Sequence, residues 1–274
     1  MKAAKATNFP DLVEITADGT SIGKTVLANR LAHLYGEFGR KVIRVQIESS
    51  RRRGSASETG DIVFINLEEF ASAGIRNGGL VGVLSPLFES VIHARKSGAG
   101  VVVDWAGGTA SHRLEVLAAT NFDATLAALQ LKALSIVMTT NSSEHMAQAE
   151  KHLHSLEKVA PNLPRALGLS GRAGPFDWPV GSEQRGHFDR LLATAGEIPV
   201  LRIPLAAGRA LQVCADAGLD PTQALLMNFD ELAARLGVHI FLATACATEI
   251  ALWWQRVGGE LRKVLEATRA PVTA

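Results

Sequence analysis

The residues Gly23, Lys24 and Thr25 offer the clearest chemistry in the sequence, at the end of the stretch ITADGTSIGKT. In this order they complete the phosphate-binding pattern G-x-x-x-x-G-K-[ST]. The glycine lets the backbone approach phosphate oxygens, the lysine reaches the β- and γ-phosphates, and the hydroxyl ligates Mg²⁺. Asp18 stands where the pattern has its first glycine, and Gly19 follows it. A working site therefore requires a turn made by this altered pair.

The segments on either side of the loop fit such a site. An apolar run at 12–16 predicts a strand, and a stretch rich in Ala and Leu at 23–38 predicts a helix whose N-terminus favours anions. Aspartate tolerates the torsions of tight turns, so Asp18 and Gly19 can form the turn, although the carboxylate adds negative charge near the phosphates. We expect Lys24 to be catalytic as well as nucleotide-binding. The expected nucleotide-binding residues of the loop are Gly19, Thr20, Ser21, Ile22, Gly23, Lys24, Thr25 and Val26.

Strand-like and helical segments alternate along the rest of the chain. The predicted strands are 12–16, 41–47, 61–67, 100–104, 133–140, 165–170 and 200–205. The predicted helices are 23–38, 78–96, 111–119, 142–159, 183–195, 206–217, 222–236 and 239–267. Alternation of this kind predicts an α/β fold, with a mainly parallel sheet and helices on both faces. We expect a single P-loop NTPase domain over 1–274, with a core at about 10–217 and extra C-terminal helices at about 218–270.

The composition narrows the class of protein. Hydrophobic residues make up 47% of the 274 residues, enough for a substantial core, and the net charge is +1. No overall field therefore draws the chain to DNA or to acidic membranes. The N-terminus lacks the apolar run of a signal peptide, and the most apolar stretch, 238–254, is short and carries Glu249. We expect a cytoplasmic protein with no transmembrane segment, in which Cys214 and Cys246 are reduced, buried thiols.

The loop and the segment after it resemble the ParA/MinD-type P-loop ATPases of the SIMIBI class. In that family the loop reads K-G-G-x-G-K-[ST], and GTSIGKT at 19–25 matches it at Gly23, Lys24 and Thr25. The following VLANRLAHLYGEFGRKVIRVQIES resembles the family's helix, turn and second strand. The resemblance implies ATP or ADP with Mg²⁺ as ligands, slow ATP hydrolysis, a nucleotide-dependent homodimer and a protein partner. It points to plasmid maintenance, conjugation or intracellular positioning, while the net charge gives no support to DNA contact.

The resemblance also assigns roles to residues at strand ends. Family members carry D-x-D-P after the second strand, and this chain has Gln46 and Glu48 in the places of the two aspartates. Glu48 keeps a carboxylate near the attacking water and the metal, and its alternative is an exposed strand-end acid. The run AGVVVDWAGG at 99–108 resembles a Walker B strand that ends with Asp104 in the Mg²⁺ shell, although such residues also start turns. We therefore expect Glu48 and Asp104 to be catalytic and, with Thr25, to ligate the metal.

Other segments match the family more loosely. Pro204, Leu205 and Ala206 lie at the end of the last predicted strand, where relatives pack a loop against the base, and the first two are expected to bind nucleotide. The run 51–53 holds three arginines, which form either a solvated charged stretch or a source of positive charge for phosphate, dimer or nucleic-acid contact. A solvated helix face is the expectation for the histidines His145, His152 and His154, which lack zinc spacing.

Two other functions compete with the ATPase interpretation. The string TADGTSIGKTV also resembles the loop of dethiobiotin synthetase, an ATP-dependent ligase, but VQIESS replaces the K-P-[VI] signature of that family. A nucleotide-binding regulator with little hydrolysis is favoured by the departures at Asp18, Gly19 and Gln46. Departures at the loop and at the second strand weaken the charge stabilisation on which phosphoryl transfer depends.

Overall fold

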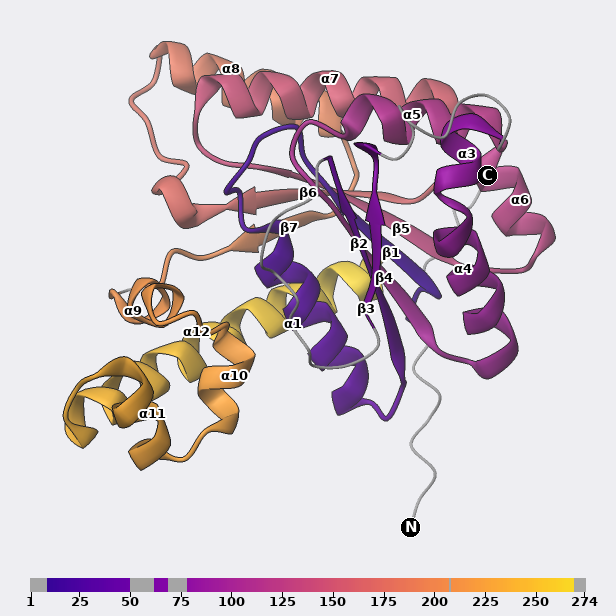
Figure 1. Cartoon of the computed structure of the whole chain (residues 1–274). Helices are drawn as coiled ribbons and strands as arrows, with labels where there is room; N and C mark the ends of the chain where they lie inside the picture. The colour runs from indigo at the N-terminus through magenta and orange to yellow at the C-terminus, as the bar shows by residue number, and fades with distance from the viewer. Residues whose placement is uncertain (1–8, 50–61, 69–77, 207, 269–274) are drawn as a thin grey trace.

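The computed structural model describes residues 9–49, 62–68, 78–206 and 208–268. Within these ranges the chain forms one parallel sheet in the order β3-β2-β4-β1-β5-β6-β7 (Figure 1). The strands are β1 (Leu12–Thr16), β2 (Val42–Glu48), β3 (Ile62–Asn66), β4 (Gly100–Trp105), β5 (Ala133–Thr139), β6 (Arg165–Ser170) and β7 (Val200–Ile203). The central strands β1, β4 and β5 are buried along their whole length, as expected for apolar strands covered on both faces.

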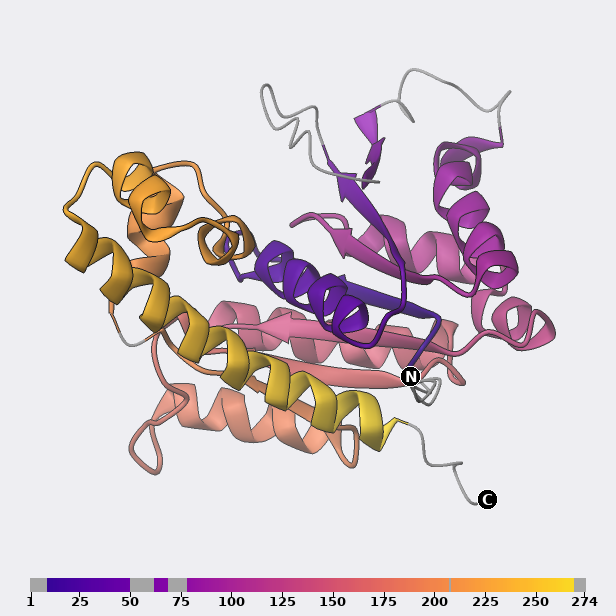
Figure 2. The same ribbon diagram turned by 90° about the horizontal axis from the view of Figure 1, so that it is seen from below.

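The helices cover both faces of the sheet, as the sequence predicts (Figures 1 and 2). The helices are α1 (Lys24–Glu37), α3 (Gly79–Val83), α4 (Ser85–Ser97), α5 (Ala110–Ala119), α6 (Phe122–Ala128), α7 (Ser143–Val159), α8 (Glu183–Ala195), α9 (Ala210–Asp216), α10 (Pro221–Leu226), α11 (Phe229–Leu236) and α12 (Ile240–Ala267), with a 3₁₀ turn η2 (Gly171–Ala173). One core packs α4 to α8 against the sheet, and the other packs α1 and the second half of α12. The predicted α/β class is confirmed.

Three helix predictions were wrong in detail. Helix α6 was missed, because its seven residues are too few to establish a periodic pattern. The segment 78–96 breaks at Leu84, and 222–236 breaks before Asn228. The second break has a clear cause, since Asn228 accepts from the backbone N–H of Glu231 while the Glu231 side chain accepts from that of Asn228. This reciprocal cap starts a new helix where a continuous one was predicted.

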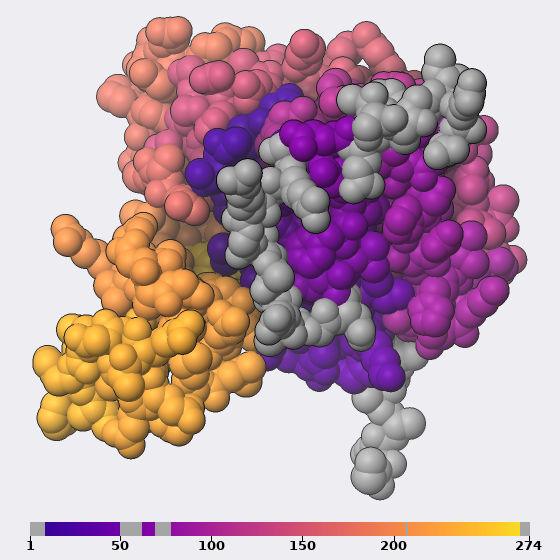
Figure 3. All heavy atoms as spheres, in the orientation of Figure 1, coloured from indigo at the N-terminus to yellow at the C-terminus, as the bar shows by residue number. Residues whose placement is uncertain are grey.

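The C-terminal helices form a lobe beside the sheet. A third apolar cluster joins α9, α10, α11 and the first half of α12, and the lobe protrudes from the molecule in the space-filling view (Figure 3). The long helix α12 then runs along the sheet next to α1 (Figure 2). Among the described residues no single helix has the length and apolar composition to cross a membrane; α11 and α12 meet that test only as a pair, bent by 102°.

Candidate nucleotide-binding site

The loop between β1 and α1 leaves the helix N-terminus open. Gly23 is the N-cap of α1 at φ 99°, and Ser21 also has a left-handed backbone at φ 56°. No side chain caps the helix, and no acidic residue lies in its first turn. The N–H groups at the start of a helix have no partner within the helix, and they carry partial positive charge. The loop therefore offers donors to an anion such as phosphate.

A substitution at Gly23 tests whether nucleotide binding depends on the left-handed backbone conformation of this residue. We expect Gly23→Ala to weaken nucleotide binding by about tenfold, because a left-handed φ costs an L-residue on the order of 1–3 kcal/mol. Space is not the obstacle, since an added Cβ would meet only Ser170 Oγ at 3.7 Å. The matched control is Gly36→Ala in the same helix, where an added Cβ meets nothing within 4 Å. Equal affinities of the two variants, measured by titration calorimetry, would contradict the expectation.

Lys24 and Asp18 lie at the two ends of the loop. Lys24 is 6% exposed, and its Nζ donates to the carbonyl of Gly19 at 2.8 Å. Burial raises the pKa of the Asp18 carboxyl, while the charges of Lys151 and Lys24 act in the opposite direction. The backbone carbonyl of Asp18 accepts from the N–H of Gly108 at 2.8 Å, which ties the loop to the segment after β4. The altered pair thus forms a bend that is tied to the segment after β4, and two lysines offset the added negative charge.

The expected metal ligands Thr25 and Asp104 are brought together. Thr25 Oγ1 donates to Asp104 Oδ2 at 2.6 Å, across 79 residues of sequence. Asp104 is 6% exposed, and its second oxygen, Oδ1, is buried without a hydrogen-bond partner among the described residues. Burial raises the pKa of Asp104, with a contribution from Glu48, while the Thr25 hydrogen bond, Lys24 and Arg44 lower it. A carboxylate held in this way suits a hard cation that prefers oxygen ligands.

Glu48 lies on the same face of the sheet as Asp104 but is held differently. Gln46 Nε2 donates to Glu48 Oε1 at 2.6 Å, and Gln46 pairs with Asp104 in the register of β2 and β4. Arg44 lies further down the same face, where burial lowers its pKa and Asp104 and Asp220 raise it. The alternation of Arg44, Gln46 and Glu48 along β2 is the signal that could have identified the arginine.

Pro204 and Leu205, the residues expected to lie near the nucleotide base, are at the same carboxyl-terminal edge of the sheet as the phosphate loop. Ser170, at the end of β6, is close to Gly23, and the next residue, Gly171, packs against the backbone of Leu205. Leu205 is 54% exposed, whereas the Pro204 carbonyl accepts from Trp253 Nε1 at 2.8 Å. The structure therefore connects the phosphate loop to the β7 loop through the end of β6, and α12 holds the β7 loop in place.

The solvated-face expectation for the histidines was wrong for two of the three. His154 is exposed, but His152 is 3% exposed and its Nε2 lies 3.1 Å from Arg113 Nη1. Burial and the charge of Arg113 lower the pKa of His152 to about 3, so its imidazole is neutral at pH 7. His145 packs against Gly19 and contacts Thr140. No pattern in the sequence indicates the contacts of His152 with Arg113 and of His145 with Gly19, which join segments far apart along the chain.

A buried polar network lies under the site. Arg113 Nη2 donates to Glu14 Oε2 at 2.7 Å and to Ser135 Oγ at 2.8 Å, and both partners of the ion pair are almost fully buried. Trp105 Nε1 donates to the other oxygen of Glu14 at 3.3 Å. The Trp105 ring itself is buried in the core. The Glu14 carboxylate on β1 thus bonds to β4 and α5. Arg113 extends this network to β5 and α7.

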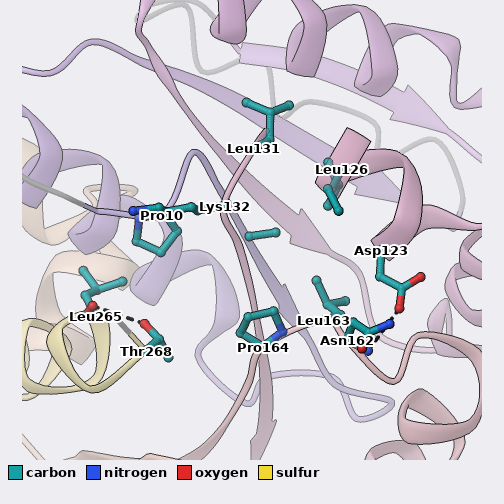
Figure 4. Close-up of a pocket in the computed structure, with 12 residues that line it drawn as sticks. Pro10, Asp123, Leu126, Leu131, Lys132, Asn162, Leu163, Pro164, Leu265 and Thr268 are labelled. Carbon is teal, nitrogen blue, oxygen red and sulfur yellow. Dashed lines mark hydrogen bonds between the residues drawn. The ribbon is translucent and has the colours of Figure 1, made fainter. Parts of the chain in front are cut away.

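Three other features are weaker candidates for a functional site. The arginines at 51–53 lie outside the described residues. Within the described part of the chain no group of three or more His, Cys, Asp or Glu side chains could hold a metal ion without other ligands. A cavity of about 300 Å³ lies at the opposite, amino-terminal edge of the sheet, and its lining is mostly apolar (Figure 4). The residues Pro10, Lys132 and Pro164 around it precede strands, which separates it from the phosphate loop.

The fold and the strand–loop–helix unit define the class: the chain has the α/β fold of P-loop NTPases. No protein-family model and no curated protein matches its sequence. Among solved structures, the MinD cell division protein of Aquifex aeolicus aligns with a TM-score of 0.45 at 11% identity, covering 91% of this chain and 97% of that one. The MinC:MinD complex of the same organism gives 0.40, 10%, 91% and 96%. Likenesses this distant carry no functional information, so function is inferred from the chain's own residues.

Proposed function

We propose that this protein is an ATPase of the ParA/MinD type, which binds ATP with Mg²⁺ and hydrolyses it slowly. Nucleotide binding promotes a homodimer that acts with a protein partner in plasmid maintenance, conjugation or intracellular positioning. The observation that carries the ATPase proposal is the contact of Thr25 with Asp104 beside the uncapped N-terminus of α1. A hydroxyl at a phosphate loop and a strand-end aspartate are the protein ligands expected of a magnesium–nucleotide site.

The residues present fit a magnesium ion. Thr25 and Asp104 would hold it, with Glu48 at the edge of the site, and nucleotide oxygens and water would complete its preferred octahedral set. Asp104 Oδ1, buried without a partner among the described residues, supports this fit. When bound, the ion neutralises charge on the phosphates. Lys24 binds the phosphates, the open N–H groups of the loop orient them, and Glu48 helps to position water.

A second candidate function is a nucleotide-binding regulator with little hydrolysis. The observation in its favour is the hydrogen bond from Gln46 to Glu48, because an amide stands where hydrolysing relatives have a carboxylate and engages the next acid along the strand. Both functions require ATP binding, and they differ in phosphate release. Micromolar binding of Mg–ATP with slow release that rises with a partner protein supports the ATPase, whereas tight binding without release supports the regulator.

The metal ligands provide the direct test of the site. We expect Asp104→Asn and Thr25→Ala to reduce the gain in ATP affinity on adding Mg²⁺ by about tenfold or more, a loss typical of a perturbed metal site. Binding is measured by calorimetry with Mg²⁺ and again with EDTA. The control is Asp216→Asn, an exposed aspartate on α9, which should retain the full magnesium effect. A magnesium effect unchanged in both site variants would remove Asp104 and Thr25 from the metal site. Sedimentation with ADP and with a non-hydrolysable ATP analogue tests the dimer separately.

A further inference from the structure

His145 lies against the start of the phosphate loop, although it comes from a different part of the chain. A Cβ built on Gly19 would lie 2.5 Å from His145 Nε2 and 2.7 Å from its Cδ2, so the imidazole packs directly on the Cα of Gly19. The backbone of Gly19 is not in the left-handed region that only glycine adopts easily. Gly19 is therefore glycine for reasons of space, and the imidazole together with Ile22 occupies that space.

Two residues just before α7 fix the orientation of the His145 side chain. Ser142 caps α7 by accepting from the His145 backbone N–H, which fixes the first turn of the helix. Thr140, at 4% exposure, places its Oγ1 2.6 Å from His145 Nδ1. The same Oγ1 accepts from the Ser142 backbone N–H at 3.4 Å, so Thr140 links His145 to the turn before α7. Because Nδ1 is turned towards Thr140, Nε2 is the ring nitrogen that faces Gly19.

The hydrogen bond from Lys24 to Gly19 indicates what the packing of His145 contributes to the site. The Gly19 carbonyl accepts from Lys24 Nζ, and a lysine that turns to a phosphate gives up this bond. After that movement, the imidazole of His145 still packs against Gly19. The backbone tie from Gly108 to Asp18 holds the residue before it. Thr140 holds the His145 imidazole in place. The imidazole can therefore keep Gly19 in position when Lys24 binds a phosphate.

We propose that His145 is a positioning residue of the nucleotide site, which holds the Asp18–Gly19 turn in its binding conformation when Lys24 contacts the phosphates. This inference rests on the proposed function, because it assumes that Lys24 binds nucleotide. It predicts that His145 acts through the Nε2 side of its ring. It also predicts that His145 and Gly19 are energetically coupled, since each occupies space that the other would need.

The experiment measures Mg–ATP affinity and the kcat and KM of phosphate release for variants of His145. We expect His145→Ala and His145→Asn to weaken ATP binding or raise KM by about tenfold, because both variants remove the edge of the ring that packs on Gly19. His145→Gln can place an amide N–H near the position of Nε2, and we expect it to recover most of the loss. Asparagine reaches only the Nδ1 position, so the comparison separates the loop contact from the Thr140 contact. His154→Ala, an exposed residue on the same helix, is the matched control.

A mutant cycle tests the coupling. We expect Gly19→Ala alone to weaken binding by at least about tenfold, and Gly19→Ala combined with His145→Ala to bind at least about threefold better than the product of the single effects. Thermal unfolding of each variant separates a folding defect from a local one. Equal losses for the Ala, Asn and Gln variants, or strictly multiplicative effects in the cycle, would overturn the positioning role. If Lys24→Met binds ATP like the wild type, the proposed function itself fails. If Lys24→Met loses binding while all His145 variants bind normally, only this inference fails.

Discussion

Replacing Lys24 by methionine is expected to reduce ATP affinity by more than about 100-fold. Lys24 is the only charged side chain in the loop sequence 19–26, and hydrogen bonds to charged groups contribute on the order of 1.5–3 kcal/mol each. Methionine retains most of the buried stem of Lys24, which is 6% exposed, and therefore limits the loss of packing. Calorimetry with Mg–ATP measures the change.

The control for this experiment is a lysine elsewhere on the surface. Lys158 lies in the last turn of α7 and is exposed, so Lys158→Met changes the same charge without touching the loop. Its ATP affinity should equal that of the wild type. A Lys24→Met variant that folds and binds ATP normally would show that the phosphate site lies elsewhere. Such a result would contradict the ATPase and the regulator proposals together, because both depend on this loop.

Breaking the buried ion pair between Glu14 and Arg113 is expected to be the most destabilising single change in the described chain. Both side chains are about 1% exposed or less, and Arg113 also donates to Ser135. Removing one partner leaves the other charge buried without compensation, at a cost of about 3–5 kcal/mol. We expect Glu14→Gln or Arg113→Met to lower the melting temperature by roughly 10 °C, measured by calorimetry or circular dichroism.

Two further variants separate the free-energy cost of leaving one buried charge unpaired from the net stabilisation by the ion pair. The double variant Glu14→Leu with Arg113→Met removes both charges, and it should be markedly more stable than either single variant. Arg185→Ala breaks an exposed ion pair with Asp189 and should cost less than about 1 kcal/mol. Single variants at Glu14 or Arg113 that match Arg185→Ala in stability would contradict the expected role of burial.

The local pattern of the sequence predicted much of the fold. Apolar runs located the seven strands of the described residues to within a few residues, because most positions of a strand covered on both faces are apolar, even where Glu14 or Arg44 interrupts the run. The P-loop pattern and the resemblance of 99–108 to a Walker B strand assigned Thr25 and Asp104 to one site, and the structure brings them into contact. Their role as metal ligands stays a prediction, as does that of Glu48.

The parts that could not be predicted depend on contacts between distant segments. Glu14 and Arg113 are 99 positions apart, and a lone glutamate in an apolar strand gives no indication of its partner. A solvated face is the expectation for His145 because the three histidines lack zinc spacing, and only the packed structure reveals that the first turn of α7 meets Gly19. Side-chain caps such as Asn228 are short-range, and a search for reciprocal caps would have found that helix start.

The shared carboxylate of Glu14 has a mechanical consequence for the residues after β4. Trp105 and Arg113 both bond to it, one on each side of the stretch 106–112, so the two ends of that stretch are anchored to a single point on the central strand. Gly107 and Gly108, within it, lie against the phosphate loop. A ligand that displaces the phosphate loop would therefore move residues 106–109 first, because Glu14 holds Trp105 and Arg113 at the two ends.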